Sequence, residues 1–566
     1  MFVVRLSLPH MKIPRDIWGF LAVWAVINLV QAAVTGLLHD EAYYWVFSQH
    51  LSGGYFDHPP GIAAMIAAGY ALVGGSLGVR LSVVLANVLT LGWLWHLIGG
   101  RDAKLYALLI ASMLLVHAGG FIAVPDIPLV LFSTAFFALL KLYLKEDDWR
   151  TAAGLGLIIA LLGYSKYHGI LVVFFSFIPN WRLIYRKSFW IIPLLAAVVY
   201  APHLYWQYAH QFPTFRYHLQ DRFRVPYYWG FFTDYLLGQL LVYGPFMSFL
   251  VFPAAVRMRT RDAFERTMKW CFYGFFGFFL YTSFRRSVEA NWTAMAVIPL
   301  VYLAYHYIAE SALLQKRVKQ WAVPSLLVAL LFRVLLVWDF LPPGWNPRNE
   351  THGWKDWAGR VATLAGDRPV VFVNSYQFPS KYMFYSGRWA HSLNEVHSAG
   401  NQFDLWPERE AAIQGREVLV LWDELKVTDS LEFANAKSRR YQIMPNFRSY
   451  NRIKIDIPES EYRLAPGATK EILITMYNPT GLPVDFQADT QPLTLRYCLF
   501  RYDKTIILED VLAPLPVKRL EPGQSVTLPV TIRAPTEKGD TYRFRLAIQN
   551  AWIAGRNSNF VRLVVK

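Results

Sequence analysis

The sequence is poor in cysteine and lacks the nucleotide-binding loops of soluble enzymes. Only two cysteines, Cys271 and Cys498, occur in 566 residues, and they fall in different regions of the chain. This spacing argues against a disulfide framework and against a CxxC metal site. The chain has no Walker loop and no GxGxxG at a strand–helix junction. These absences argue against an ATP-driven pump and against an enzyme built on a nucleotide-binding Rossmann domain.

Charge is also scarce, and long apolar segments take its place. Charged residues make up 17% of the chain and hydrophobic residues 54%. Apolar runs of about 20 residues, long enough to cross a bilayer, recur from Trp18 to about Leu341. Short alternating segments follow Pro342. The pattern predicts a polytopic α-helical membrane domain over residues 1–342, with about 12 apolar helices, and a soluble tail.

The formal net charge of +16 comes largely from Lys and Arg in short loops between the apolar runs. This distribution is typical of the cytoplasmic loops of membrane proteins and does not indicate nucleic-acid binding. Arg5, Lys12 and Arg15 precede the first apolar run, so we expect an uncleaved first span that starts in the cytoplasm. Counting the later runs then predicts that the soluble tail is extracytoplasmic.

One stretch conflicts with this count of crossings. Asp57 and Asp126 are both expected outside, yet three apolar runs separate them, at 62–73, 81–98 and 105–121. An odd number of crossings cannot return to the same side. Because Arg80, Arg101 and Lys104 flank the middle run, we predict that this run starts and ends near the cytoplasmic face. It would then be short, tilted or re-entrant, as is tolerated inside a protein cavity.

The tail divides into two predicted domains. Residues 343–450 mix strand-like segments such as 370–373 and 418–422 with helix-like segments, which indicates a small extracytoplasmic α/β domain. Residues 451–566 contain about six or seven short strands separated by turn signals such as NPTG and EPGQ. This second pattern predicts an immunoglobulin-like all-β sandwich.

The polar stretch between the first two apolar runs carries the leading functional signal. Residues 39–60 contain three carboxylates and three histidines but no Lys or Arg: His39, Asp40, Glu41, His50, Asp57 and His58. Carboxylates beside a membrane span are costly to desolvate and usually have a function. Asp40 and Glu41 are therefore candidate catalytic acids or bases. The alternative is that they cap a helix and form an interfacial salt bridge.

Other polar residues near the expected outer face are candidates for substrate binding. Asp126 opens an apolar run, where it can either cap the helix or orient a substrate. Lys166 and His168 in SKYHG can hold a phosphate, although a single Lys near a helix end also snorkels to the interface. Arg222, Arg285 and Glu289 lie in two outer loops and are candidates too, the alternative being solvated ion pairs. His39, His58 and Asp126 are candidate metal ligands, but without a diagnostic spacing.

Six segments in this order resemble a known enzyme family. They are DEAYYW from Asp40, YFDHPP from Tyr55, Arg80 opening LSVVLAN, PDIPL from Pro125, SKYHG from Ser165 and EANW from Glu289. Together they are similar to bacterial membrane glycosyltransferases of the lipid A aminoarabinose transferase and protein O-mannosyltransferase type. The resemblance covers about the first 340 residues and does not include the β-sandwich.

The resemblance implies the C-type glycosyltransferase fold and a location in the bacterial cytoplasmic membrane. It also implies a polyprenyl (undecaprenyl) phosphate sugar donor and transfer with inversion to an extracytoplasmic acceptor such as lipid A, another envelope glycan or protein. In such a family the residue at Asp40, beside Glu41, is catalytic, and the basic residue before the Pro-Pro pair contacts the donor phosphate. That residue is His58 here, where Lys is more usual, so Lys166, Arg222 and Arg285 are alternatives for the phosphate contact. Asp57 is a further candidate for substrate binding. The sequence identifies no specific cofactor, and a divalent cation is a candidate.

Two other functions remain open from the sequence. A flippase or transporter for lipid-linked sugars is one, although the ionisable residues cluster at one face and no internal repeat occurs. A sensor or scaffold whose β-sandwich binds cell-wall material is the other.

Overall fold

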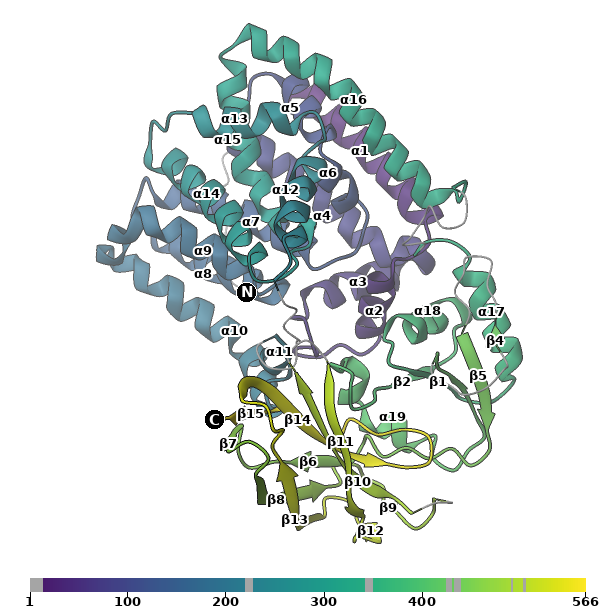
Figure 1. Cartoon of the computed structure of the whole chain (residues 1–566). Coiled ribbons are helices and arrows are strands. Elements are labelled where there is room, and N and C mark those ends of the chain that lie inside the picture. The colour runs from purple at the N-terminus through teal and green to yellow at the C-terminus, as the bar shows by residue number, and fades with distance from the viewer. Residues whose placement is uncertain are drawn as a thin grey trace.

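The computed structural model describes residues 14–218, 227–341, 350–423, 430–431, 439–489, 492–501 and 505–566. A helical bundle forms the N-terminal part, and two β-containing domains lie together against one end of it (Figure 1). We call this end, which carries α2 (His39–Ser48) and α3 (Gly61–Leu72), the tail face of the bundle.

Within the described ranges, six helical segments are long and apolar enough to cross a membrane. They are Arg15–Val34 (α1), Gly75–Ile98 (α4), Asp126–Tyr143 (α7), Lys187–Ala209 (η2 and α10), Ala290–Ala309 (η4 and α15) and Ala312–Val337 (α16). The remaining helices of the bundle are α5 (Ala103–Ala111), α6 (Leu114–Gly119), α8 (Trp149–Ser165), α9 (Gly169–Phe177), η1 (Ile178–Tyr185), α11 (Pro213–Arg216), α12 (Gly230–Val242), α13 (Ser248–Arg257) and α14 (Ala263–Ser283).

The long helices differ in how much of their surface the protein covers. In the segment that contains α15, 78% of the most apolar stretch of 18 residues is buried within the protein. The corresponding shares for the segments that contain α10 and α16 are 17% and 22%. Large apolar side chains such as Val198 and Leu330 are exposed on these outer helices. Because water does not favour such a surface, this exposure is what a lipid-facing helix requires.

The structure corrects the predicted path between Asp57 and Asp126. The run at 81–98 was predicted to be short, tilted or re-entrant. It belongs to α4, which has 24 residues and is long enough to cross, so the first of these alternatives, a short segment, is wrong. The short element is α3, whose 12 residues span only about 18 Å.

The prediction that Arg80 marks the cytoplasmic end of this run is also not supported by the structure. It lies near the start of α4, fully buried, with its guanidinium bonded to Glu41 at the tail face. A buried arginine with a partner gives no information about the cytoplasmic side, because the charge-distribution rule applies to loops.

The loop between α2 and α3 is fixed against α10 and α11. The backbone oxygen of Gly53 lies 2.7 Å from His203 Nδ1, and the oxygen of Tyr55 accepts a hydrogen bond of 3.1 Å from Thr214 Oγ1. Gly54 packs directly on Trp206, where a Cβ would come within 2.5 Å of Cε3. The small residues of the segment 52–54 therefore allow this close packing. The packing fixes the loop that carries Asp57 and His58.

The α/β domain follows α16 and contains the predicted strands. Its helices are α17 (Trp354–Ala365), α18 (Gln377–Ser386), η5 (Gln402–Leu405) and α19 (Pro407–Ala411), and its strands are β1 (Val370–Val373), β2 (Ala390–Leu393), β3 (Val418–Leu421), β4 (Ser430–Leu431) and β5 (Arg439–Met444). The sheet order is β2-β1-β3-β5-β4, with β2, β1 and β3 parallel and β5 antiparallel. The predicted boundary at 342 falls on residues 342–349, outside the described ranges.

The last part of the chain is a β-sandwich. One sheet has the order β11-β10-β14-β15-β7 and the other β13-β8-β6, around a shared core that includes Ile474, Leu499 and Phe544. The strands are β6 (Lys454–Asp456), β7 (Glu461–Leu464), β8 (Thr469–Tyr477), β9 (Val484–Asp485), β10 (Thr494–Arg501), β11 (Ile506–Pro514), β12 (Arg519–Leu520), β13 (Ser525–Arg533), β14 (Gly539–Gln549) and β15 (Val561–Val565).

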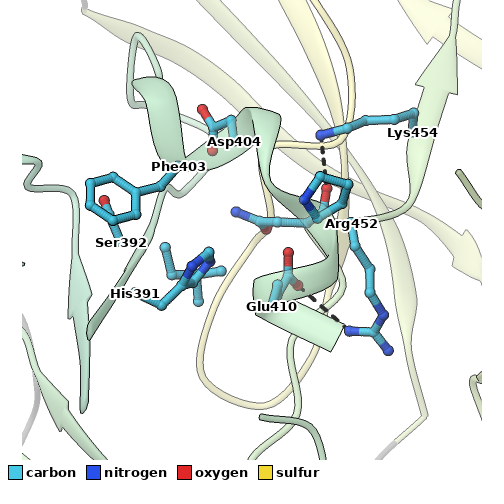
Figure 2. Close-up of a pocket in the computed structure, with 10 residues that line it drawn as sticks. His391, Ser392, Phe403, Asp404, Glu410, Arg452 and Lys454 are labelled. Atoms are coloured by element: carbon cyan, nitrogen blue, oxygen red, sulfur yellow. Dashed lines mark hydrogen bonds and ion pairs between the residues drawn. The ribbon is translucent and has the colours of Figure 1, made fainter. Parts of the chain in front are cut away.

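A small charged pocket lies where the α/β domain joins the sandwich (Figure 2). Glu410 of α19 pairs with Arg452 at 3.6 Å, and Lys454 donates to the oxygen of Asn451. The cavity of about 10 Å³ is large enough for no more than a water molecule. We therefore regard it as part of the packing between the two domains.

Candidate active site at the tail face

Asp40 and Glu41 are neighbours at the start of α2, but their surroundings differ. Glu41 is completely buried, whereas Asp40 is exposed to solvent. Many protein atoms nevertheless surround the exposed carboxylate. Loss of bulk water to the surrounding protein raises the pKa of Asp40 from its usual range, while a hydrogen bond from Tyr376 lowers it. Asp40 thus combines access with a shifted pKa, which is typical of a catalytic acid or base.

Glu41 is the centre of a buried network. Its Oε1 accepts from Arg80 Nε at 2.7 Å and from the N–H of Ala123 at 2.8 Å. Its Oε2 accepts from Arg80 Nη2 at 2.5 Å and from the N–H of Leu38 at 2.8 Å. Both carboxylate oxygens therefore already hold two hydrogen bonds.

Arg80 completes this network. Its remaining N–H groups donate to the backbone oxygens of Ala32, Thr35 and Gly36, at 3.2, 2.6 and 2.9 Å. One buried ion pair thus joins the end of α1, the start of α2, α4 and the segment before α7. We call Glu41, Arg80 and these backbone partners the anchor.

Asp126 and Lys166 form a second buried ion pair. Lys166 Nζ lies 2.8 and 2.9 Å from the two oxygens of Asp126, and Asn291 Nδ2 donates to Asp126 Oδ2 at 3.1 Å. The pair links the starts of α7 and η4 with the SKYHG turn. The prediction that these segments meet on one side of the bundle agrees with these contacts. The sequence did not indicate Asn291 as a partner, although it lies in the EANW motif.

Asp57 and His58 are only partly satisfied. His58 Nε2 and Asp57 Oδ2 are 4.0 Å apart, and both side chains are half-buried. Burial, followed by the charge of Asp40, raises the pKa of Asp57 to about 7. Burial, followed by Lys166, lowers the pKa of His58 to about 3, so its imidazole is neutral near neutral pH. We call Asp40, Asp57 and His58 the open site.

Several buried side-chain atoms near the open site have no hydrogen-bond partner within the described ranges. These atoms are Asp57 Oδ1, His58 Nδ1 and His168 Nδ1. Burial lowers the pKa of His168 well below its usual value, with Lys166 the next cause. Unpaired buried polar atoms are costly and usually mark a site that a ligand or water completes.

The other predicted binding residues lie farther from this network. Arg285 and Glu289 are exposed, and the Arg285 guanidinium stacks over the ring of Tyr281 at 5.2 Å. The charge of Glu289 still contributes to raising the pKa of Asp40. Arg222 lies outside the described residues.

The candidate metal ligands do not form a metal site. Among the described residues, no group of three or more His, Cys, Asp or Glu side chains is placed to hold an ion. Asp126 is paired with Lys166, and the ring of His39 packs on Trp354 at 4.9 Å. The suggestion that His39, His58 and Asp126 bind a metal together is therefore not supported by this geometry.

Three comparisons show which known proteins this chain is similar to. Residues 57–206 match a family model described as dolichyl-phosphate-mannose-protein mannosyltransferase. The lipid A galacturonosyltransferase RgtD of Rhizobium johnstonii is 27% identical over 394 residues, which cover 64% of this chain and 72% of that protein. The crystal structure of ArnT from Cupriavidus metallidurans superposes with a TM-score of 0.54 and 15% identity, over 72% of this chain and 93% of that chain. ArnT bound to undecaprenyl phosphate gives the same TM-score.

The superposition on ArnT shows that the membrane part has the fold of that protein, which the sequence analysis predicted as the C-type glycosyltransferase fold. The predicted fold class is confirmed: a helix-rich membrane part with this fold, followed by a β-rich C-terminal region. The predicted number of about 12 apolar helices is not confirmed by the six long and three shorter apolar helices among the described residues.

Proposed function

We propose that this glycosyltransferase moves one sugar from a polyprenyl phosphate, such as undecaprenyl phosphate, to an acceptor outside the cytoplasm. The observation that carries the proposal is the contrast between neighbouring carboxylates. Asp40 is exposed, while Glu41 is buried and bonded to Arg80. The relatives RgtD and ArnT are named as a lipid A sugar transferase and as a protein solved with undecaprenyl phosphate. The name of RgtD favours transfer over the alternative of transport.

Asp40 acts as the general base in this proposal. A carboxylate oxygen takes the proton from the acceptor hydroxyl or amine as that atom attacks the anomeric carbon of the sugar. The bond from the anomeric carbon to the phosphate oxygen breaks, and the polyprenyl phosphate leaves with the electron pair. A single displacement of this kind inverts the anomeric carbon. General-base catalysis contributes about 10²–10⁴-fold to such a reaction.

The leaving phosphate needs positive charge and hydrogen-bond donors. Lys166 supplies positive charge, and the neutral rings of His58 and His168 can supply N–H donors; the Lys166 charge acts on both histidines. Lys166 is already paired with Asp126, so its charge is partly compensated. An arriving phosphate would raise the pKa of His58 and give its unpaired Nδ1 a partner. Arg285, which is exposed just before the EANW segment, is the remaining candidate.

The orientation of the protein belongs to the same proposal. The tail face would lie outside the cytoplasm, since the open site must meet a lipid-linked donor and an envelope acceptor. The acceptor classes are lipid A, another glycan, or protein.

The experiment is a comparison of envelope lipids, glycans and proteins by mass spectrometry. It uses a deletion strain, the same strain carrying the wild-type chain, and the same strain carrying Asp40→Asn. We expect one glycosyl mass difference that disappears on deletion, returns with the wild type and stays absent with Asp40→Asn. Identical envelopes in the parent and deletion strains would argue against the proposal.

A further inference from the structure

The α/β domain reaches the catalytic helix through a turn at the end of its central strand. β1 ends at Val373, and Asn374 follows in the left-handed region with φ 57°. Ser375 Oγ accepts from the N–H of Phe378 at 3.2 Å and starts α18. Tyr376 lies between Ser375 and the first residue of α18, at the carboxyl edge of the parallel strands. In open α/β sheets this edge is where ligands and functional residues gather.

Tyr376 contacts Asp40 directly. Its hydroxyl donates to Asp40 Oδ1 at 3.1 Å, and its ring packs on Tyr43 with a centroid separation of 4.4 Å. Burial raises the pKa of Tyr376 far above its usual value, so the hydroxyl stays protonated and can donate.

The domain is held against α2 on several sides. The N–H of Gln402 donates to Tyr43 Oη at 2.7 Å, and Gln402 Oε1 accepts from the N–H of Phe56 at 2.8 Å. The N–H of Leu37 donates to Tyr385 Oη at 2.9 Å. These contacts fall before α2, within it and in the loop that follows it. Figure 1 shows α2 and α18 next to each other where the bundle meets the α/β domain.

An apolar core continues through the same interface. Tyr43 and Phe47 of α2 belong to one buried cluster with Trp354, Phe378 and Tyr382 of the α/β domain. Burial of apolar surface stabilises this contact. The position of Tyr376 relative to Asp40 is thus fixed by packing as well as by hydrogen bonds.

We propose that Tyr376 is a positioning residue for Asp40, and that the α/β domain is therefore part of the active site. The inference rests on the proposed function. The hydrogen bond occupies Oδ1 and fixes the carboxylate, which leaves Oδ2 to take the acceptor proton. A site completed by a separate domain also explains why the sequence motifs of the bundle did not reveal this residue.

The surroundings of Asp40 predict how the pH profile depends on Tyr376. The groups that face Asp40 are Glu41 and Tyr44 on its own helix, Asp57 on the following loop, and Glu289, Glu350 and Tyr376 on other elements. The acids Glu350, Glu289 and Glu41 raise the pKa of Asp40, and the Tyr376 hydrogen bond lowers it. Loss of that bond would raise the pKa of Asp40 and move the acid limb of activity to higher pH.

The test compares Tyr376→Phe with Tyr382→Phe in the full-length protein. Phe keeps the ring on Tyr43 but removes the donor. Tyr382 lies on the same helix, is buried, and packs on Phe372 rather than on Asp40. A hydrogen bond to a charged group is worth about ten- to hundred-fold. We therefore expect kcat of Tyr376→Phe to fall by that factor, with the KM for the sugar-donor lipid little changed. The acid limb of the pH–activity profile should shift to higher pH. Tyr382→Phe should behave as the wild type.

Two results would contradict the inference. One is an unchanged kcat and pH profile in Tyr376→Phe, with an active wild type. The other is a loss of activity without any movement of the acid limb, which indicates a purely structural role. A wild type that transfers no sugar from any polyprenyl phosphate donor would instead overturn the proposed function, and this inference with it.

A second variant covers the case in which Tyr376→Phe does not fold. Replacing Tyr376 by 3-fluorotyrosine keeps the ring and makes the phenol a stronger donor. The acid limb should then move to lower pH, the opposite direction from the Phe variant. A limb that stays in place would contradict the inference.

Discussion

The anchor and the open site each contain one of two adjacent carboxylates, Glu41 and Asp40, but the surroundings of these two carboxylates differ. In the anchor, Glu41 has four hydrogen bonds and no exposed surface. In the open site, Asp40 is exposed and the Oδ1 of Asp57 has no partner among the described residues. The difference teaches that a carboxylate in this part of the chain is structural when protein hydrogen bonds occupy both of its oxygens. It is available for chemistry when an oxygen is left open.

Breaking the anchor is the first way to test this comparison, and it should have the largest effect on stability. Arg80→Met removes five hydrogen bonds and leaves the Glu41 charge buried without its partner. Removing one member of a buried ion pair costs about 3–5 kcal/mol. We expect a clearly lower midpoint of thermal unfolding in detergent, or loss of folded protein. A midpoint equal to that of the wild type would show that the anchor is not structural.

The pH dependence of stability gives a second, smaller effect. Folding raises the pKa of Asp57 from its ordinary value of 3.8 to about 7. Between these values the folded state holds more protons than the unfolded state, so the contribution of Asp57 to stability is complete below pH 3.8 and is lost as the pH rises to about 7. The slope is at most about 1.4 kcal/mol per pH unit.

Asp57→Asn removes this titration. We expect the variant to gain stability relative to the wild type as the pH rises from 4 to 7, and the difference to level off above pH 7. The measurement is the unfolding midpoint of both proteins across this range. Parallel curves for the two proteins would contradict the assignment of a raised pKa to Asp57.

The smallest effect is expected at the opposite end of the bundle. Arg261 and Glu310 form an ion pair in which both side chains are about 60% exposed. An exposed pair of this kind contributes about 0–1 kcal/mol. Arg261→Met should therefore leave the unfolding midpoint almost unchanged, and it serves as the matched control for Arg80→Met. A loss comparable to that of Arg80→Met would show that removal of any arginine destabilises the bundle.

Much of the fold could be predicted from the sequence, because its signals are local. Apolar length identified the spanning segments, and alternation identified strands such as β8 and β13. The path at α3 and α4 could not be predicted in this way. Twelve apolar residues lying at the tail face and a full span look alike in composition, and a buried arginine at the start of α4 looks like a cytoplasmic charge.

The candidate site was predictable only in part, for a related reason. The motifs located Asp40, Asp126 and Lys166, but a pair of adjacent acids gives no sign of which one the fold will seal. That depends on Arg80, about 40 residues away, and on backbone donors such as Ala123. Tyr376 is more distant still, 336 residues from Asp40 along the chain. Its signal was a polar turn at the end of a parallel strand, which has meaning only once the domain is placed against α2.

The most direct test of the account is the rate of sugar transfer by purified Asp40→Asn, measured together with its unfolding midpoint in lipid nanodiscs. The account predicts a rate lower by about 10²–10⁴-fold with a midpoint equal to that of the wild type, because Asp40 holds no part of the anchor. A variant that transfers sugar at the wild-type rate would contradict the account.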